Sequence, residues 1–238
     1  MGVTDPDLHH ERTLLKEGAN VIAGIDEVGR GAWAGPVTVG VVSIVSDREP
    51  PKGTRDSKMV SPSNRKRLVP EIERWASGWG IGHASPRECD EHGMTRAIAL
   101  AASRALDQLP TRPDAVIVDG PFDLLRIDDE GLGELVRGHR WRSHPPKRIE
   151  AVVKADQVCA SVAAASILAK VARDALMVEL SDSFPAFDFD RNVGYPSPSH
   201  QRALRGYGLT PLHRRSWSFT DSIPWQGPLA QSLSGASG

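Results

Sequence analysis

The sequence predicts an α/β fold, a mixed β-sheet with helices on its faces. Two β-branched, apolar runs early in the chain, 21–26 and 36–45, are separated by a glycine-rich turn, which indicates a pair of neighbouring strands in a hairpin. Later apolar runs alternate with amphipathic or alanine-rich stretches, which indicates strands separated by helices. A hairpin followed by such an alternation is typical of a mixed sheet that helices cover.

Each element follows from its local pattern. Ser61 and Pro62 supply an N-cap and a first-turn proline for one helix, and the alanine-rich stretch 95–109 has the pattern of a helix that packs closely on a sheet. The expected strands are 21–26, 36–45, 79–84, 115–119 and 149–154. The expected helices are 62–76, 93–108 and 157–180, with shorter ones near 86–91 and 197–206. The last strong helix and the segment after it are expected to form a small lobe against the sheet.

The chain of 238 residues is long enough for one large domain or two small ones. We expect an N-terminal extension (1–20), a catalytic domain (21–217) and a disordered tail (218–238). No run is long and apolar enough for a membrane span or the core of a signal peptide, so a cytoplasmic protein with no membrane partner is expected. The isolated Cys89 and Cys159 fit small buried residues better than a disulfide framework or a zinc site.

The charge is balanced overall but uneven along the chain. The formal net charge is −1, yet the stretches 135–148 and 200–217 contain cations and no acids. Such stretches suit a phosphate backbone, and they also occur as solvated loop faces. The sequence leaves both interpretations open for each stretch.

The most informative segment is 26–31, which reads Asp-Glu-Val-Gly-Arg-Gly directly after the apolar run. Carboxylates at the end of a buried strand are costly to desolvate unless a cation lies beside them. Because neighbouring strand residues point to opposite faces, Asp26 and Glu27 can face one metal ion only if the strand ends or bends there. The glycines permit such a bend. Their spacing, with a strand rather than a helix after them, excludes a dinucleotide site, but a hairpin with solvated charges stays open.

Two further acids follow apolar runs in the same way. Asp119 ends the run 115–118. Asp156 comes just after the expected strand 149–154 and directly before a helix, so it could also be the N-cap of that helix. Carboxylates gathered at one sheet edge repel one another unless cations neutralise them. Oxygen ligands alone favour magnesium or manganese over zinc.

In these motifs the chain resembles the type 2 ribonucleases H, the ribonuclease HII enzymes of bacteria. Segment 26–31 matches the signature of the family, and the motif Arg-Asp-Ser-Lys at 55–58 resembles its D-S-K motif. Further matches follow in order at 116–120, at 154–156 with the helix 161–174, and from 194–195 through 211–216. The resemblance covers roughly residues 20–217. Departures are the residues after Asp156, the proline at 121, and a long insertion at 121–148 of unknown purpose.

The resemblance implies an RNase H-like mixed sheet flanked by helices, with a C-terminal helical extension. It implies a monomeric endonuclease that cleaves the RNA strand of RNA–DNA hybrids and incises duplex DNA at single embedded ribonucleotides, leaving 5′-phosphate and 3′-hydroxyl ends. Two magnesium or manganese ions roughly 4 Å apart would serve the hydrolysis. The implied catalytic residues are Asp26, Glu27, Asp119 and Asp156, the first three as metal ligands. The implied substrate-binding residues are Gly29, Arg30, Gly31, Lys58, Lys170 and Tyr195.

The glycine turn and Tyr195 have more specific expected roles. The backbone of 29–31 would recognise the 2′-hydroxyl group, so that a Cβ atom at Gly31 should clash. Tyr195 could be an ordinary surface or core-edge residue; the resemblance implies that its ring packs on the sugar 3′ of the ribonucleotide. The rival functions are another RNase H-like nuclease, such as a resolvase, and a non-catalytic hybrid-binding protein. The Gly-Arg-Gly turn argues against the first, and the complete set of acids argues against the second.

Overall fold

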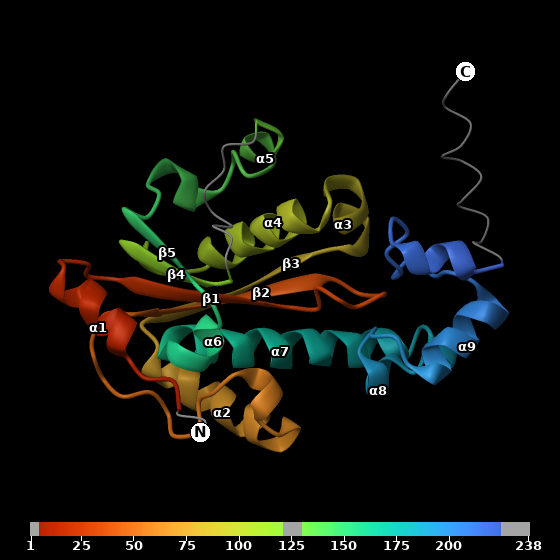
Figure 1. Cartoon of the computed structure of the whole chain (residues 1–238), viewed down its shortest axis with the longest axis horizontal. Helices are drawn as coiled ribbons and strands as arrows, with labels where there is room; N and C mark the ends of the chain where they lie inside the picture. The colour runs from red at the N-terminus through yellow and green to blue at the C-terminus, as the bar shows by residue number, and fades with distance from the viewer. Residues whose placement is uncertain (1–4, 121–129, 225–238) are drawn as a thin grey trace.

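A five-stranded sheet with the order β3-β2-β1-β4-β5 forms the centre of the molecule (Figure 1). The structure is a computed structural model that describes residues 5–120 and 130–224, without the side chains of 130–132. The strands are β1 (Ile22–Val28), β2 (Val37–Ile44), β3 (Gly78–Ala84), β4 (Ala115–Asp119) and β5 (Arg148–Val152). All the predicted strands are therefore confirmed, with ends that differ by up to two residues. The sheet is mixed, because β2 pairs antiparallel with β1 and with β3, while β4 pairs parallel with β1 and with β5.

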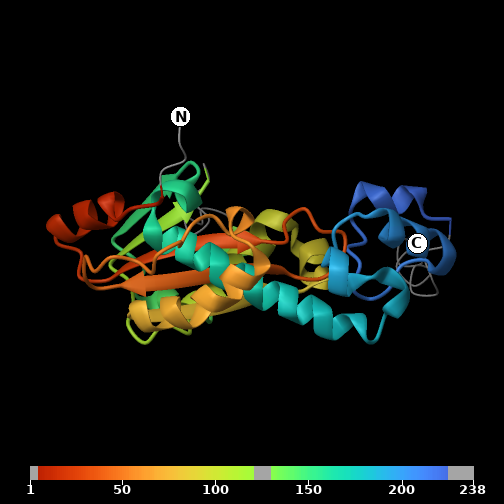
Figure 2. The same cartoon turned by 90° about the horizontal axis from the view of Figure 1, so that it is seen from below.

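Two long helices cover the two faces of the sheet. Helix α4 (Met94–Leu106) lies on one face, and α7 (Ala160–Ser181) runs along the other and continues past the sheet (Figures 1 and 2). Both helices lie very close to the strands, since a Cβ atom at Gly82 would overlap the carbonyl group of Ala101, and one at Gly40 would overlap that of Ala165. The predicted close packing of the alanine-rich helix is thereby confirmed.

The remaining helices are shorter. They are α1 (His9–Lys16), α2 (Pro62–Trp75), α3 (Pro86–His92), α5 (Glu130–Leu135), α6 (Ala155–Val158), α8 (Phe189–Asn192) and α9 (Pro198–Tyr207). Ser61 caps α2 by accepting a hydrogen bond from the amide of Asn64, with Pro62 in the first turn, as predicted. The helix predicted at 157–180 is divided instead into α6 and α7, because Cys159 between them has extended backbone angles.

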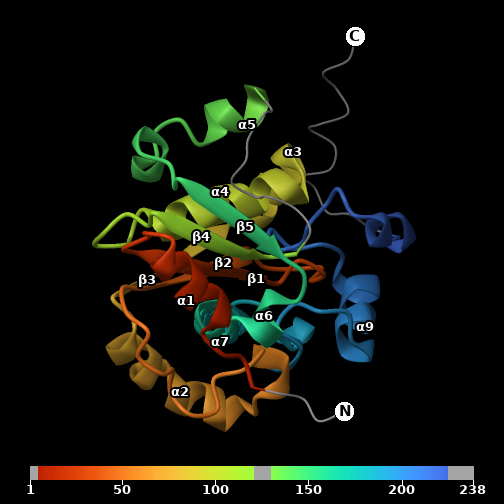
Figure 3. The same cartoon turned by 60° about the vertical axis from the view of Figure 1, so that its left-hand side comes forward.

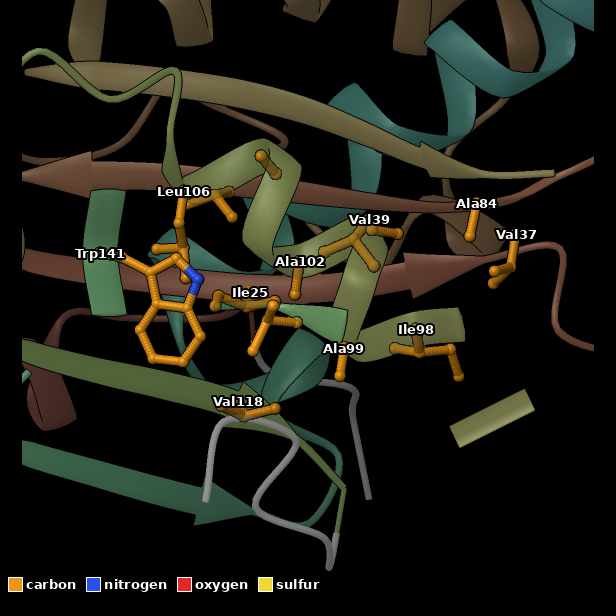
Figure 4. Packing of buried hydrophobic residues seen from close by; sticks show 14 of the residues in the cluster. Ile25, Val37, Val39, Ala84, Ile98, Ala99, Ala102, Leu106, Val118 and Trp141 are labelled. Atoms are coloured by element: carbon orange, nitrogen blue, oxygen red, sulfur yellow. The ribbon is translucent and has the colours of Figure 1, made fainter. Parts of the chain in front are cut away.

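The core between the sheet and α4 extends to the basic stretch 135–148. Trp141 is 3 % exposed and packs near Leu106 and Val118 in this core (Figure 4). His139 lies 2.7 Å from a carboxylate oxygen of Asp107 at the end of α4. This part of the predicted insertion is therefore docked on the domain, while its first part, 121–129, lies outside the described residues.

The N-terminal segment is part of the fold. Helix α1 lies on the side of the sheet that α7 covers (Figure 3). Leu14 of this helix and Leu8, the residue directly before it, are buried in the core between the sheet and α7. The backbone of Asp7 bonds to Val158 and Ala160, on either side of the α6–α7 junction. Residues 5–20 are thus an integral support of the domain and not an appended extension.

The C-terminal residues form a lobe around the far end of α7. Its core joins Met177 of α7 to Phe187, Phe189 and Phe219. Disorder from residue 218 onward is a wrong prediction for the first residues of that tail, because Ser218–Ser222 form a 3-10 helix that buries Phe219. Residues 225–238 lie outside the described part of the chain. Among the described helices, none is long and apolar enough to cross a membrane, and both cysteines are free and buried, as predicted.

Candidate active site

Asp26 and Glu27 lie within β1, near its end. The strand continues to Val28, so the prediction that it ends at Asp26 is wrong by two residues. The alternation along the strand therefore holds, and the two carboxylates leave opposite faces of the sheet. Asp26 is only 6 % exposed, and it faces α7, where the side chain of Ser166 lies beside it.

Asp119 and Asp156 stand beside this strand end. The last pair between β1 and β4 is Ile25 with Val118, so Asp119 follows one residue beyond it, next to Asp26. A carboxylate oxygen of Asp119 accepts a hydrogen bond of 2.6 Å from the amide of Ala155, which ties β4 to α6. Asp156 lies in the first turn of α6, and neither α6 nor α7 has a side-chain cap. The alternative interpretation of Asp156 as an N-cap is therefore wrong.

The four carboxyl groups interact electrostatically. Burial, and then the charge of Glu27, raises the pKa of Asp26 well above its usual value, and Asp119 and Asp156 add to the shift. Burial also raises the pKa of Glu27, and the charge of Arg30 opposes that rise. Because these carboxylates repel one another, a cation bound between them would be favourable.

Asp156 is involved in a second interaction, with the segment 56–58. Burial raises the pKa of Asp156 to about 6, and the neighbouring Asp56 adds to the rise. The ammonium group of Lys58 lies 3.9 Å from a carboxylate oxygen of Asp156 and 4.0 Å from one of Asp56. Lys58 therefore supplies positive charge to this side of the cluster.

The cluster fits a hard divalent cation in the kind of donors that it offers, since all four are carboxylates. Among the residues that the structure describes, however, no three His, Cys, Asp or Glu side chains lie close enough together to hold one ion in common. The physical reasons are the strand alternation of Asp26 and Glu27 and the contact of Asp156 with Lys58. Binding of one ion by this set therefore requires these side chains to move.

A cleft of about 450 Å³ opens at this end of the sheet. Its lining residues are Asp26, Glu27, Val28, Gly29, Arg30, Gly31, Ser57, Lys58, Lys170 and Tyr195. The structure therefore brings together in one cleft all the site residues predicted from the sequence except Asp119 and Asp156, which lie next to it through their interactions with Asp26.

The glycine turn on one wall of the cleft is held from behind by Arg214. Gly29 has a φ of +86°, a conformation that favours glycine. The guanidinium group of Arg214 donates hydrogen bonds to the carbonyl oxygens of Gly29 (2.6 Å), Arg30 (2.8 Å) and Gly35 (3.2 Å). Arg214 is fully buried, so the interpretation of 200–217 as a basic surface is wrong for this residue.

Tyr195 also lines the cleft, and two cations of α7 lie against its ring. The ammonium nitrogen of Lys170 lies 5.9 Å from the centre of the Tyr195 ring, and the guanidinium carbon of Arg173 lies 5.5 Å from it. Arg173 is buried and donates to the carbonyl oxygens of Ala34, Pro36 and Val193. Lys170 and Arg173, three residues apart on α7, thus share the face that carries Tyr195.

The sequence analysis missed several residues of this site. Ser57 lines the cleft, and its hydroxyl group accepts a hydrogen bond of 2.9 Å from that of Ser166. Asp56 interacts with Asp156. Asp56 and Ser57 could have been found from their place next to Lys58 in the D-S-K motif, whereas the role of Arg214 has no local sequence signal.

Comparison with known proteins agrees with this geometry. The model of the family described as ribonuclease HII matches residues 23–220. The ribonuclease HII of Streptomyces avermitilis is 48% identical over 222 residues, covering 92% of this chain and 87% of the relative. The chain belongs to the ribonuclease HII family. It is accordingly a ribonuclease H endonuclease.

Solved structures of related ribonucleases have the same fold as this chain. The ribonuclease H2 of Pyrococcus horikoshii OT3 superimposes with a TM-score of 0.64 at 28% identity, covering 85% of this chain and 96% of the other. The RNase HII of Archaeoglobus fulgidus, solved in a complex with PCNA, gives a TM-score of 0.63 at 25% identity, covering 89% of this chain and 99% of the other. The predicted RNase H-like sheet with a C-terminal helical extension is thereby confirmed.

Proposed function

We propose that this ribonuclease HII cleaves the RNA strand of RNA–DNA hybrids and incises duplex DNA at single embedded ribonucleotides, leaving 5′-phosphate and 3′-hydroxyl ends. One observation carries the proposal: a single cleft is lined by Asp26 and Glu27, by the Gly29–Gly31 turn and by Tyr195. Groups suited to hydrolysis and groups suited to recognition of a sugar thus lie side by side. Family membership supports the same substrate class.

In this proposal Asp26, Glu27 and Asp119 hold divalent metal ions, magnesium or manganese, and Asp156 completes or organises the site. Ions bound there would activate water and stabilise the leaving 3′ oxygen. The side chain of Ser166 lies beside the carboxylate of Asp26 and favours its ionised form. The amide of Ala155 holds Asp119 at the end of β4. Lys58 limits the repulsion at Asp156 until a cation does so.

The glycine turn recognises the ribonucleotide. The 2′-hydroxyl group is both a donor and an acceptor and distinguishes RNA from DNA. Backbone groups of Gly29 to Gly31 can approach it closely, because space for substrate lies directly before the turn. Arg30, Lys58 and Lys170 supply positive charge for the phosphates on either side.

Tyr195 recognises the next sugar. Its ring lines the cleft beside Gly31, and Lys170 and Arg173 lie over it. A flat ring packed on a deoxyribose resists the bulk of a 2′-hydroxyl group at that position. The enzyme would then favour a ribonucleotide that is followed by a deoxyribonucleotide.

Substitution of single carboxylates tests the proposal. Asp26→Asn and Asp119→Asn should each abolish cleavage of DNA that contains one ribonucleotide, with saturating magnesium or manganese, while the circular dichroism spectrum stays unchanged. Asp190→Asn, at an exposed position on α8, is the matched control and should retain activity. Near-normal turnover by either site variant would refute the assignment, whereas duplex binding without cleavage by the unmodified protein would favour the non-catalytic rival.

A further inference from the structure

The C-terminal segment Thr210–Arg214 contacts both the glycine turn and, through two histidines, the backbone of Tyr195. Within it, the amide of Arg214 donates to the carbonyl oxygen of Trp33 (2.9 Å), and the amide of Gly35 donates to that of Leu212 (2.8 Å). A β-bridge joins Ala34 to His213 between these bonds. Because the Arg214 side chain also holds Gly29 and Arg30, this segment is fixed to the glycine turn.

His213 connects the same segment to Tyr195 through a second histidine. The Nε2 atoms of His213 and His200 are 2.9 Å apart, and Nδ1 of His200 lies 2.9 Å from the carbonyl oxygen of Tyr195. At the other end, Nδ1 of His213 lies 2.9 Å from the amide nitrogen of Thr210 and 2.8 Å from its hydroxyl oxygen. The chain of contacts therefore runs from Thr210 through both imidazoles to the backbone of Tyr195.

The partners at the two ends assign both tautomers. A carbonyl oxygen only accepts, so His200 must donate from Nδ1 to Tyr195. The amide of Thr210 only donates, so Nδ1 of His213 must accept. His213 therefore carries its proton on Nε2 and donates it to Nε2 of His200. Every ring nitrogen is satisfied in this arrangement, and both rings are neutral.

The surroundings favour this neutral state. His200 is fully buried and His213 is 1 % exposed, and rings of Trp33, Phe187 and Phe189 lie against His200. A buried polar network that is satisfied in one arrangement only fixes the relative position of the groups it joins. If His200 and His213 served only to fill the core, apolar side chains at these positions would do so without the cost of desolvating the ring nitrogens.

We propose that His200 and His213 are positioning residues which set the height of the Tyr195 ring relative to the glycine turn, and thereby the preference for a ribonucleotide followed by a deoxyribonucleotide. The inference rests on the proposed role of Tyr195. The histidine pair acts at a distance from the reacting atoms, because its contact with Tyr195 is to the backbone carbonyl oxygen. Its loss should therefore change substrate preference more than the cleavage chemistry.

The test compares single-turnover rates on two substrates of the same sequence, a DNA duplex with one ribonucleotide and a full RNA–DNA hybrid. Tyr195→Ala should lower the ratio of the first rate to the second by roughly tenfold to a hundredfold. His213→Leu should lower the same ratio by about fivefold to tenfold. His213→Gln can still accept and donate, so it should restore most of the ratio. Thr210→Val, a milder change at the start of the chain of contacts, should lower the ratio slightly even if His213→Leu does not fold.

A double substitution separates positioning from general destabilisation. Adding His213→Leu to Tyr195→Ala should change the ratio no further, whereas independent effects would multiply. Leu106→Ala, in the core on the other face of the sheet, is the matched control that lowers stability without changing the ratio.

The outcomes distinguish the positioning role of His200 and His213 from the proposed function. Unchanged ratios in His213→Leu and Thr210→Val, or multiplied effects in the double variant, would overturn the positioning role and leave that of Tyr195 intact. An unchanged ratio in Tyr195→Ala would overturn both roles, while cleavage at the embedded ribonucleotide by the unmodified enzyme would still support the proposed function.

Discussion

Two glycines of the cleft differ sharply in what a side chain would meet. A Cβ atom at Gly31 would have only a ring carbon of Tyr195 within contact range, at 3.9 Å, an ordinary van der Waals distance. The predicted clash at Gly31 is therefore absent within the protein and could arise only with bound substrate. At Gly29, by contrast, φ is +86° and a Cβ atom would overlap the Arg173 side chain.

Alanine substitutions at these glycines should therefore separate recognition from folding. We expect Gly31→Ala to keep its melting temperature while losing cleavage by more than it loses duplex binding, since the added methyl group faces the substrate. Gly29→Ala should be destabilised, because its backbone and Arg173 must both move. Thermal melts, filter binding and cleavage rates on the two variants measure the three effects. Equal losses of cleavage and binding in Gly31→Ala would count against recognition by the turn.

Asp26 should limit the stability of the metal-free protein. Its pKa is raised by burial and by the neighbouring acids, so its ionised form is less favourable in the folded state than in the unfolded state. Because the folded pKa is the higher one, stability falls as pH rises through the range between the two values. Asp26→Asn should raise the melting temperature in EDTA at pH 7 by about 2–8 °C, and by less at pH 4.

With divalent metal, the unmodified protein should melt at a higher temperature than Asp26→Asn, the reverse of the order expected in EDTA. Magnesium or manganese should raise the melting temperature of the unmodified protein, because an ion that binds only the folded state stabilises it. The rise should be much smaller in Asp26→Asn. A variant that is less stable than the parent in EDTA at pH 7 would contradict the repulsion account.

At the scale of elements, the strands were predictable and the supports of the site were not. Buried strands such as β1 and β4 are runs of apolar residues with acids at or near the end. This pattern can be recognised from the local sequence alone. Helix α1 has little such signal, since its buried face combines Leu8 and Leu14 with the charged Glu11. The C-terminal lobe depends on aromatic residues far apart in sequence, such as Phe187 and Phe219. Their spacing follows neither the helical nor the strand period, so the sequence does not show that they pack together.

Helix α1 should contribute measurably to stability through Glu11. One carboxylate oxygen of Glu11 accepts hydrogen bonds from the amide (2.9 Å) and the hydroxyl group (2.7 Å) of Ser161, in the first turn of α7. Glu11→Ala leaves that buried amide without its partner, so it should lower the free energy of unfolding by about 1–3 kcal/mol. Denaturant unfolding measures the change. Glu17→Ala, at an exposed position just after the same helix, is the control and should cost less than about 0.5 kcal/mol.

At the scale of the whole molecule, the candidate site combines three separate parts of the chain. The sheet end supplies Asp26 and Asp119, helix α7 supplies Ser166 and Lys170, and the C-terminal lobe supplies Tyr195. The carboxylates and the glycine turn could be predicted because each follows its own strand. Their support by Arg214 could not, since its acceptors lie about 180 positions earlier in the chain.

The central claim is that this one cleft joins metal-dependent hydrolysis to recognition of a single ribonucleotide. It is tested most directly with the unmodified protein, magnesium or manganese, and a DNA duplex that contains one ribonucleotide, with the product ends mapped. The account predicts one incision at the ribonucleotide that leaves a 5′-phosphate and a 3′-hydroxyl group, no cleavage of the all-DNA duplex, and no cleavage in EDTA. Incision of the all-DNA duplex at a similar rate, or 2′,3′-cyclic phosphate ends formed in EDTA, would contradict it.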